Sequence, residues 1–157
     1  MSRVSPTLSA WQRMSKWFCE KWMFSELLCL KAPYFASIRP RFEALRPGYS
    51  EVHMTKRRAV LNHIGTMHAI AMCNMAELVG GTVTDATIPI THRYIPKGMT
   101  VEYLKKAETS LRAIAELEPI PSLDGTVELP VTVNVLDTRD QTVFRAVITM
   151  WVSPKKG

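Results

Sequence analysis

The residues that could carry chemistry in this sequence gather between positions 62 and 77. Asn62, Gly65 and His68 lie close together, and Glu77 follows nine residues after the histidine. The segment around Glu77 is otherwise apolar, and an ionised carboxylate buried without a partner costs several kcal/mol or takes up a proton. A carboxyl group in such surroundings could act as a general base near neutral pH. The alternative is a structural glutamate at a partly exposed helix end, hydrogen-bonded by its neighbours.

Residues 62–81 predict a loop that continues into one long helix. After the glycine-containing loop the chain is rich in Ala, Met, Leu and Ile, and Gly80-Gly81 is typical of a helix C-cap. Because this helix is apolar on nearly every side, we expect it to be buried. At 100° per residue, the side chains within about 60° of Glu77 are those of Thr66, Ile70, Cys73 and Asn74. His68 points to the opposite side, which excludes a direct His68–Glu77 dyad within the helix.

The start of this helix could bind an anion or a developing oxyanion. Backbone N–H groups at a helix N-terminus lack intrahelical partners, and Gly65 allows a ligand to approach closely. Either His63 or His68 could instead be a structural residue. Neither histidine has the spacing to further His, Cys or acidic residues that a metal site requires, so we expect no metal. We also expect no cofactor.

Composition favours one globular domain with reduced thiols. The chain has 157 residues, of which 46% are hydrophobic and 22% are charged, which is ordinary for a protein that buries a core. Cys19, Cys29 and Cys73 are odd in number and lack a CxxC spacing, which indicates a cytoplasmic location. We find neither a secretory signal nor an apolar run long enough to cross a membrane.

Positive charge is concentrated in the first third of the chain. Through Arg58 there are 11 Lys and Arg against 4 Asp and Glu, whereas the remainder has 9 against 10. This asymmetry suits an anionic partner: nucleic acid, a membrane surface or a phosphate-bearing small molecule. The alternative is a set of solubilising surface charges. Nucleic acid is disfavoured because aromatic platforms and a recognisable binding module are lacking.

The remaining patterns predict an α+β protein. Leu8–Leu30 has helical periodicity and three Trp, so it could lie on a membrane interface or, as we prefer, pack on its own domain or an oligomer. A strand from Tyr34, a turn at residues 46–48 and a return through Thr55 form a hairpin. At least three antiparallel strands follow the helix, the last at residues 142–152 and central. Pro130 indicates a sheet edge or a bulge. We divide the chain into a helical extension, 1–31, and a main domain, 32–157.

The motif Asn62-x-x-Gly65-x-x-His68, followed by the acidic Glu77, resembles that of hotdog-fold acyl-CoA thioesterases of the phenylacetyl-CoA type. In that family Asn-x-x-Gly-x-x-His-Gly-Gly precedes an Asp or Glu in the central helix. Residues 101–117 and 135–152 are similar to later strands of the same fold, and the resemblance covers about residues 34–153. Residues 62–78 are most similar to a little-characterised branch of this superfamily, described as putative thioesterases.

The resemblance implies a hotdog fold, an antiparallel sheet wrapped around a central helix, here with an extra N-terminal helix. It implies that Glu77 is the general base or the nucleophile in thioester hydrolysis. Asn62 would position the carbonyl or the water from the facing subunit. The backbone N–H groups near His68 and Ala69 would form the oxyanion hole, and Gly65 and His68 would shape the loop.

The resemblance also implies an acyl-CoA substrate and a homodimer or homotetramer. From the residues themselves we expect no nucleic-acid partner and no obligatory membrane attachment. Thr66, Cys73 and Asn74 would line the site, and the basic run Lys56-Arg57-Arg58 would meet the phosphates of coenzyme A. Ala69-Ile70 replaces the family's Gly-Gly pair. This departure supports an alternative, a non-catalytic acyl-CoA-binding or regulatory module, whereas a hotdog hydratase is disfavoured because its motif is absent.

Overall fold

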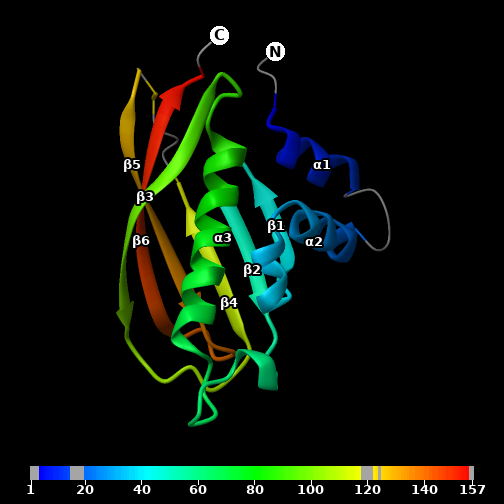
Figure 1. The fold of residues 1–157 in the computed structure, drawn as a ribbon, viewed down its shortest axis with the longest axis vertical. Coiled ribbons are helices and arrows are strands. Elements are labelled where there is room, and N and C mark those ends of the chain that lie inside the picture. The colour runs from blue at the N-terminus through cyan, green and yellow to red at the C-terminus, as the bar shows by residue number, and fades with distance from the viewer. Residues whose placement is uncertain (1–3, 15–19, 118–121, 124, 156–157) are drawn as a thin grey trace.

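The computed structural model describes residues 4–14, 20–117, 122–123 and 125–155 (Figure 1). The helices are α1 (Pro6–Met14), α2 (Glu20–Lys31) and α3 (Ala69–Thr87), with short 3-10 helices η1 (Pro33–Ile38) and η2 (Arg58–Val60). The strands are β1 (Arg41–Arg46), β2 (Tyr49–Met54), β3 (His92–Tyr103), β4 (Leu111–Glu116), β5 (Val127–Leu136) and β6 (Thr142–Pro154). Within these ranges, none of the helices combines the length and the apolar content needed to cross a membrane.

The six strands form one antiparallel sheet in the order β1-β2-β4-β5-β6-β3. Figure 1 shows α3 lying along one face of this sheet, with α1 and α2 beside β1. The predicted α+β arrangement, a sheet around one long helix, is therefore confirmed. The central position predicted for the last strand is also confirmed, since β6 lies between β5 and β3.

The alternation predicted along β5 appears as alternating burial, because successive side chains of a strand point to opposite faces. Pro130 lacks a backbone N–H, yet it lies in a strand that has neighbours on both sides. Among the described residues, β4 pairs with residues 133–136 of β5. Pro130 pairs with Thr149 of β6 on the other side. On the β4 side the register places the position opposite Pro130 outside the described residues, so the edge or bulge expected there stays a prediction.

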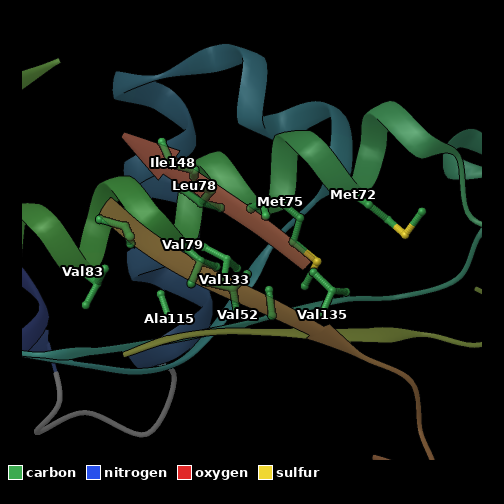
Figure 2. Close-up of a cluster of buried hydrophobic side chains, with 14 of the residues drawn as sticks. Val52, Met72, Met75, Leu78, Val79, Val83, Ala115, Val133, Val135 and Ile148 are labelled. Carbon is green, nitrogen blue, oxygen red and sulfur yellow. The ribbon is translucent and has the colours of Figure 1, made fainter. Parts of the chain in front are cut away.

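The core fills the space between α3 and the concave face of the sheet (Figure 2). Buried residues of α3 pack against buried residues from four different strands, among them Val52, Ala115, Val133 and Ile148. A Cβ atom at Gly80 would lie 2.8 Å from Ile148 Cδ1, closer than real carbon atoms approach. Glycine at this position therefore allows the helix to lie directly against the sheet.

Helix α3 does not end at Gly80-Gly81, so the predicted C-cap is wrong. It continues for almost two more turns, to Thr87, and ends where Pro89 follows the Ile88 cap. The hydroxyl groups of Thr84 and Thr87 donate to carbonyl oxygens one turn earlier. These bonds satisfy threonines that local propensity alone would place outside a helix.

The N-terminal segment forms two packed helices, so the single helix predicted over residues 8–30 is wrong. The rings of Trp11 and Phe24 meet edge to face at 5.1 Å between centroids, although 13 residues of continuous helix would separate them by about 20 Å. Phe24 also meets Phe42 of β1 at 5.0 Å. Leu8 and Phe24 belong to the same buried core as the sheet. Trp17 lies outside the described residues.

The strand predicted from Tyr34 is also wrong at its start. Residues 33–38 form η1, and β1 begins at Arg41. Prolines at positions 33 and 40 frame this short helix, because proline favours a helix start and disfavours helical backbone in the residue before it. The predicted hairpin between β1 and β2 is confirmed, with Gly48 in the left-handed region at its turn.

Candidate functional site

Asn62 organises the loop that precedes α3. Its Oδ1 accepts hydrogen bonds from the backbone N–H groups of Ile64 and Thr66, both at 3.1 Å. Its Nδ2 donates to Thr66 Oγ1 at 2.7 Å, and its own backbone N–H donates to the carbonyl of Thr66. In this chain the side chain therefore holds its own loop, and one Nδ2 hydrogen is left to contact a substrate or water.

Gly65 lies at the tip of this loop with φ 79°, a conformation that disfavours residues with a Cβ atom. A Cβ here would meet nothing within 4 Å, so the backbone conformation, not crowding, requires the glycine. Because α3 begins at Ala69, Thr66 belongs to the loop. Its expected place on the helix face of Glu77 is therefore wrong.

His68 is the N-cap residue of α3. Its Nδ1 accepts a hydrogen bond from the backbone N–H of Ile70 at 3.1 Å, and the imidazole is otherwise exposed. Its own backbone N–H donates to the carbonyl of Val60 at 2.8 Å. The structure thus gives His68 a capping role, with Nδ1 as an acceptor and the hydrogen of the neutral ring on Nε2.

The predicted oxyanion hole requires a correction. The His68 N–H is already bonded to Val60, and the Ile70 N–H is bonded to the cap. By contrast, the N–H groups of Ala69 and Ala71 have no acceptor within the described part of the chain. These two amides, at the positive end of the helix dipole, are the donors that could meet an oxyanion.

Asn74 lies on the side of α3 that faces η1. It is 5% exposed, and its Nδ2 donates to Ser37 Oγ at 3.0 Å. Its Oδ1 is buried and lacks a partner among the described residues. Together with His68, Ile70 and Ser37 it lines a pocket of about 240 Å³. The structure therefore brings Asn74 and His68 to one pocket, and the buried Oδ1 of Asn74 is left without a donor among the described residues.

Glu77 lies on an exposed row of α3, one turn after Cys73. The carboxylate is exposed and has no hydrogen-bond or ion-pair partner in the described ranges, so the expected burial within this chain is wrong. Ile70 on the same side of the helix is 55% exposed, which also corrects the prediction of a helix buried on every side. Helix α3 therefore contacts the sheet with one face and presents Glu77 on the other.

Strand β3 borders this exposed row. Tyr103 Oη lies 3.6 Å from Cys73 Sγ, and this hydrogen bond, with burial as a smaller cause, raises the pKa of the tyrosine to about 12. Met99 and Tyr103 pair with Ile148 and Phe144, whose side chains are buried against α3. Paired residues share a face, so Met99 and Tyr103 point to the helix side of the sheet. They remain 40% and 52% exposed, because α3 does not cover this edge.

The basic run Lys56-Arg57-Arg58 is divided among three environments. Lys56 Nζ donates to the carbonyl of Glu108 at 2.7 Å. Arg57 donates to the carbonyl of Ser37 at 2.6 Å, and its Nε is buried without a partner. Arg58 is exposed in η2. The three side chains therefore do not form a single phosphate clamp in this chain.

Two residues of the site were missed from the sequence. Ser37 lies in a stretch that reads as a strand, and only the η1 turn brings its hydroxyl to Asn74. Tyr103 has period-two neighbours that indicate a strand, but its contact with Cys73 depends on the long-range pairing of β3 with β6. Neither contact leaves a local signal in the sequence.

Comparison with known proteins places this arrangement in a family. Residues 20–152 match the family described as a domain of unknown function, DUF4442. The crystal structure of a structural-genomics protein, APC5556, is 49% identical with a TM-score of 0.82, and the match covers 95% of this chain and 98% of that one. No curated protein matches the chain.

Two further solved structures have the same fold. PA5026 from Pseudomonas aeruginosa, described as a probable thioesterase, is 26% identical with a TM-score of 0.76 over 83% of this chain and 93% of that one. The protein smu.793 from Streptococcus mutans, bound to acetyl-CoA, is 21% identical with a TM-score of 0.61 over 74% and 90%. The chain belongs to the DUF4442 family, and its fold is the hotdog fold of the thioesterase superfamily.

Proposed function

We propose that this protein is a thioesterase that hydrolyses acyl-CoA, with Glu77 acting on the thioester. The proposal draws support from PA5026, which is described as a probable thioesterase, and from smu.793, which binds acetyl-CoA. Within the chain, it draws support from an unpaired acid and two unpaired amides on the same helix. These are the groups that acyl transfer to water needs.

The observation that carries the proposal is the exposure of Glu77 beside an unpaired sheet edge. The carboxylate shares one side of the molecule with exposed apolar side chains, Ile70 on α3 and Met99 on β3. Within the described residues, β3 pairs only with β6, so its other edge is open. An apolar surface and an open strand edge favour association with a second copy. We infer a homodimer that covers Glu77.

A dimer also resolves a problem of distance. Glu77 follows Ala69 by eight residues, which separates the two by about 12 Å along the helix axis. One carbonyl group cannot contact both within a single chain. If two copies face each other with opposite helix directions, the amides of Ala69 and Ala71 from one copy approach Glu77 of the other. Each site would then be shared between subunits.

The carboxylate of Glu77, a water molecule and the amides of Ala69 and Ala71 are enough to carry out thioester hydrolysis. With Glu77 as base, the carboxylate takes a proton from water, and the oxygen attacks the thioester carbonyl. The amides of Ala69 and Ala71 stabilise the oxyanion, the carbon–sulfur bond breaks, and the thiolate of coenzyme A receives the proton from Glu77. With Glu77 as nucleophile, an acyl anhydride forms first and water then hydrolyses it.

The second candidate is a module that binds acyl-CoA without hydrolysing it. One observation favours it: the Asn62 Oδ1 already accepts two hydrogen bonds within its own loop, so a single Nδ2 hydrogen is left to hold the carbonyl or a water. The two candidates separate in a single experiment, release of free thiol from a panel of acyl-CoA substrates. Turnover on any member supports the thioesterase, whereas binding without turnover supports the module.

A further inference from the structure

A groove with three arginines lies apart from the pocket at the start of α3. Helix α2 forms one wall, and the chain that enters β1 and leaves β2 forms the other, in the region where Figure 1 shows α2 beside β1. Its volume is about 550 Å³. This volume lies within the range of about 300–1,000 Å³ that is typical of small-ligand sites.

The groove has an excess of positive charge. Arg39, Arg41 and Arg57 line it, and Glu26 is the acidic residue among its lining side chains. Arg57 is bonded to the carbonyl of Ser37. The guanidinium groups of Arg39 and Arg41 have no acceptor among the described residues, and both side chains are exposed. Guanidinium groups that line one groove without ion-pair partners favour a phosphate-bearing ligand.

The walls of the groove are held in place. The Ser25 hydroxyl accepts a hydrogen bond from the backbone N–H of Phe42 at 3.0 Å, and it donates to the carbonyl of Lys21. Lys21 also forms an ion pair with Glu43 of β1. These contacts fasten α2 to β1. The two free arginines therefore extend from a fixed backbone, which lowers the entropy lost when a ligand binds.

Trp22 gives the groove an aromatic surface. It is 59% exposed, unlike Trp11, which packs against Phe24. An exposed indole beside arginines can stack on a nucleobase while the guanidinium groups bind phosphate. Aromatic stacking and several cations in one groove together fit a phosphorylated nucleoside better than a simple phosphate ion.

The groove and the pocket at the start of α3 have different lining residues, but hydrogen bonds to Ser37 connect them. Arg57 in the groove donates to the carbonyl of Ser37, and the hydroxyl of the same serine accepts from Asn74 in the pocket. A ligand with a nucleotide at one end and an acyl group at the other could reach both. Acyl-coenzyme A has this form, since its adenosine 3′,5′-bisphosphate end carries the charge.

We propose that the groove of Arg39, Arg41, Arg57 and Trp22 binds the adenosine 3′,5′-bisphosphate end of coenzyme A. This inference rests on the proposed function for its choice of ligand. It replaces the run Lys56-Arg57-Arg58 as the phosphate site, because Lys56 donates to a backbone carbonyl instead. It also names coenzyme A, rather than an acyl carrier protein, as the carrier of the acyl group.

The test measures binding of adenosine 3′,5′-bisphosphate by calorimetry, with adenosine and inorganic phosphate as separate probes. The double variant Arg39→Gln/Arg41→Gln should bind the bisphosphate at least about tenfold more weakly than wild type. Trp22→Ala should weaken the bisphosphate and leave phosphate unchanged. Arg58→Gln removes a neighbouring positive charge outside the groove and serves as the matched control, with binding near wild type. Circular dichroism checks that each variant folds.

The outcomes separate this site from the proposed activity. If wild type does not bind the bisphosphate, or if Arg39→Gln/Arg41→Gln binds it as wild type does, the site is wrong, whatever the hydrolysis assay shows. Tight binding that is lost in the double variant supports the site even without thioester turnover. In an active enzyme, the double variant should raise KM for acyl-CoA and leave an acyl-pantetheine substrate unaffected. If the double variant and wild type have the same KM for acyl-CoA, the assignment is overturned.

Discussion

The imidazole Nδ1 of His68 accepts a hydrogen bond from the backbone N–H of Ile70, with 3.1 Å between the two nitrogens. This contact makes the histidine of the Asn-x-x-Gly-x-x-His motif an N-cap. The motif therefore has a structural reason to contain a side chain with an acceptor at this position. Asparagine is also a good N-cap, whereas alanine is a poor one, so the two substitutions separate capping from chemistry.

We expect His68→Ala to lower the free energy of unfolding by about 1 kcal/mol and His68→Asn to lower it by less. The Asn variant should also keep thioester kcat within severalfold of wild type. Urea unfolding at a fixed protein concentration and steady-state kinetics measure the two effects. If His68→Asn folds normally but loses activity by orders of magnitude, the imidazole takes part in the reaction.

The close approach of α3 to the sheet predicts opposite effects at two adjacent glycines. Gly80→Ala should destabilise the protein relative to Gly81→Ala by about 1 kcal/mol or more, because its Cβ would lie 2.8 Å from Ile148 Cδ1 and the buried isoleucine would have to turn away, whereas both variants gain the same helix propensity. Gly81→Ala meets only ordinary contacts with Tyr94 and should be neutral or stabilising, since alanine favours helix. Ile148→Val removes the clashing methyl and should recover part of the Gly80→Ala loss. Equal unfolding midpoints for both alanine variants would contradict this packing.

The sequence predicts elements whose signal is local and misses features that depend on distant contacts. The alternation of β5 and the turn at Gly48 follow from side-chain period and turn chemistry, and both are confirmed. The end of α3 is mispredicted because Gly80 is present to fit against Ile148, a contact that sequence cannot show. Gly80-Gly81 has the composition of a C-cap, but the helix continues through it to Thr87.

In the candidate site, too, the sequence predicts the local features and misses those that depend on other contacts. The motif finds the loop and the helix, but it does not show that the Asn62 side chain bonds within the loop. The exposure of Glu77 was missed because apolar residues all round a helix indicate burial without telling whether one chain or two provide it. The division into α1 and α2 was missed because the apolar spacing of the N-terminal segment suits one long helix as well as two packed ones.

The raised pKa of Tyr49 predicts that the folded protein loses stability at alkaline pH. Burial, and next the hydrogen bond it donates to Glu51 at 2.6 Å, raise the pKa of Tyr49 to about 12. Its pKa in the unfolded chain is about 10, so the fold favours the neutral phenol. The stabilisation that the neutral phenol gives the folded state is fully present below pH about 10, and it is lost as the pH rises toward 12.

The unfolding free energy of wild type should therefore fall more steeply between pH 10 and 12 than that of Tyr49→Phe. Other groups titrate in this range, and the difference between the two proteins isolates the tyrosine. Chemical denaturation at several pH values provides the measurement. Parallel curves for the two proteins would show that Tyr49 titrates alike in the folded and unfolded states.

The exposed side of α3 and β3 predicts a dimer. Wild type should have twice the 17.8 kDa mass of the chain by light scattering, or a multiple of that value. Met99→Glu places a charge on the helix side of β3 and should shift the mass toward the monomer, with loss of thioester hydrolysis. Ile95→Glu is the matched control, because Ile95 is also exposed but pairs with Trp151 on the opposite face. A folded, active monomer would exclude the shared site.

The central claim is that the carboxylate of Glu77 acts on the thioester, and kcat for acyl-CoA hydrolysis by Glu77→Gln tests it most directly. Gln keeps the size and polarity of the side chain but cannot take up the proton, so we predict a loss of about two orders of magnitude or more. Acyl-CoA affinity, melting temperature and oligomer mass should stay near wild type. Glu116→Gln, at an exposed position of β4, should hydrolyse normally. Hydrolysis by Glu77→Gln at the wild-type rate would contradict the account.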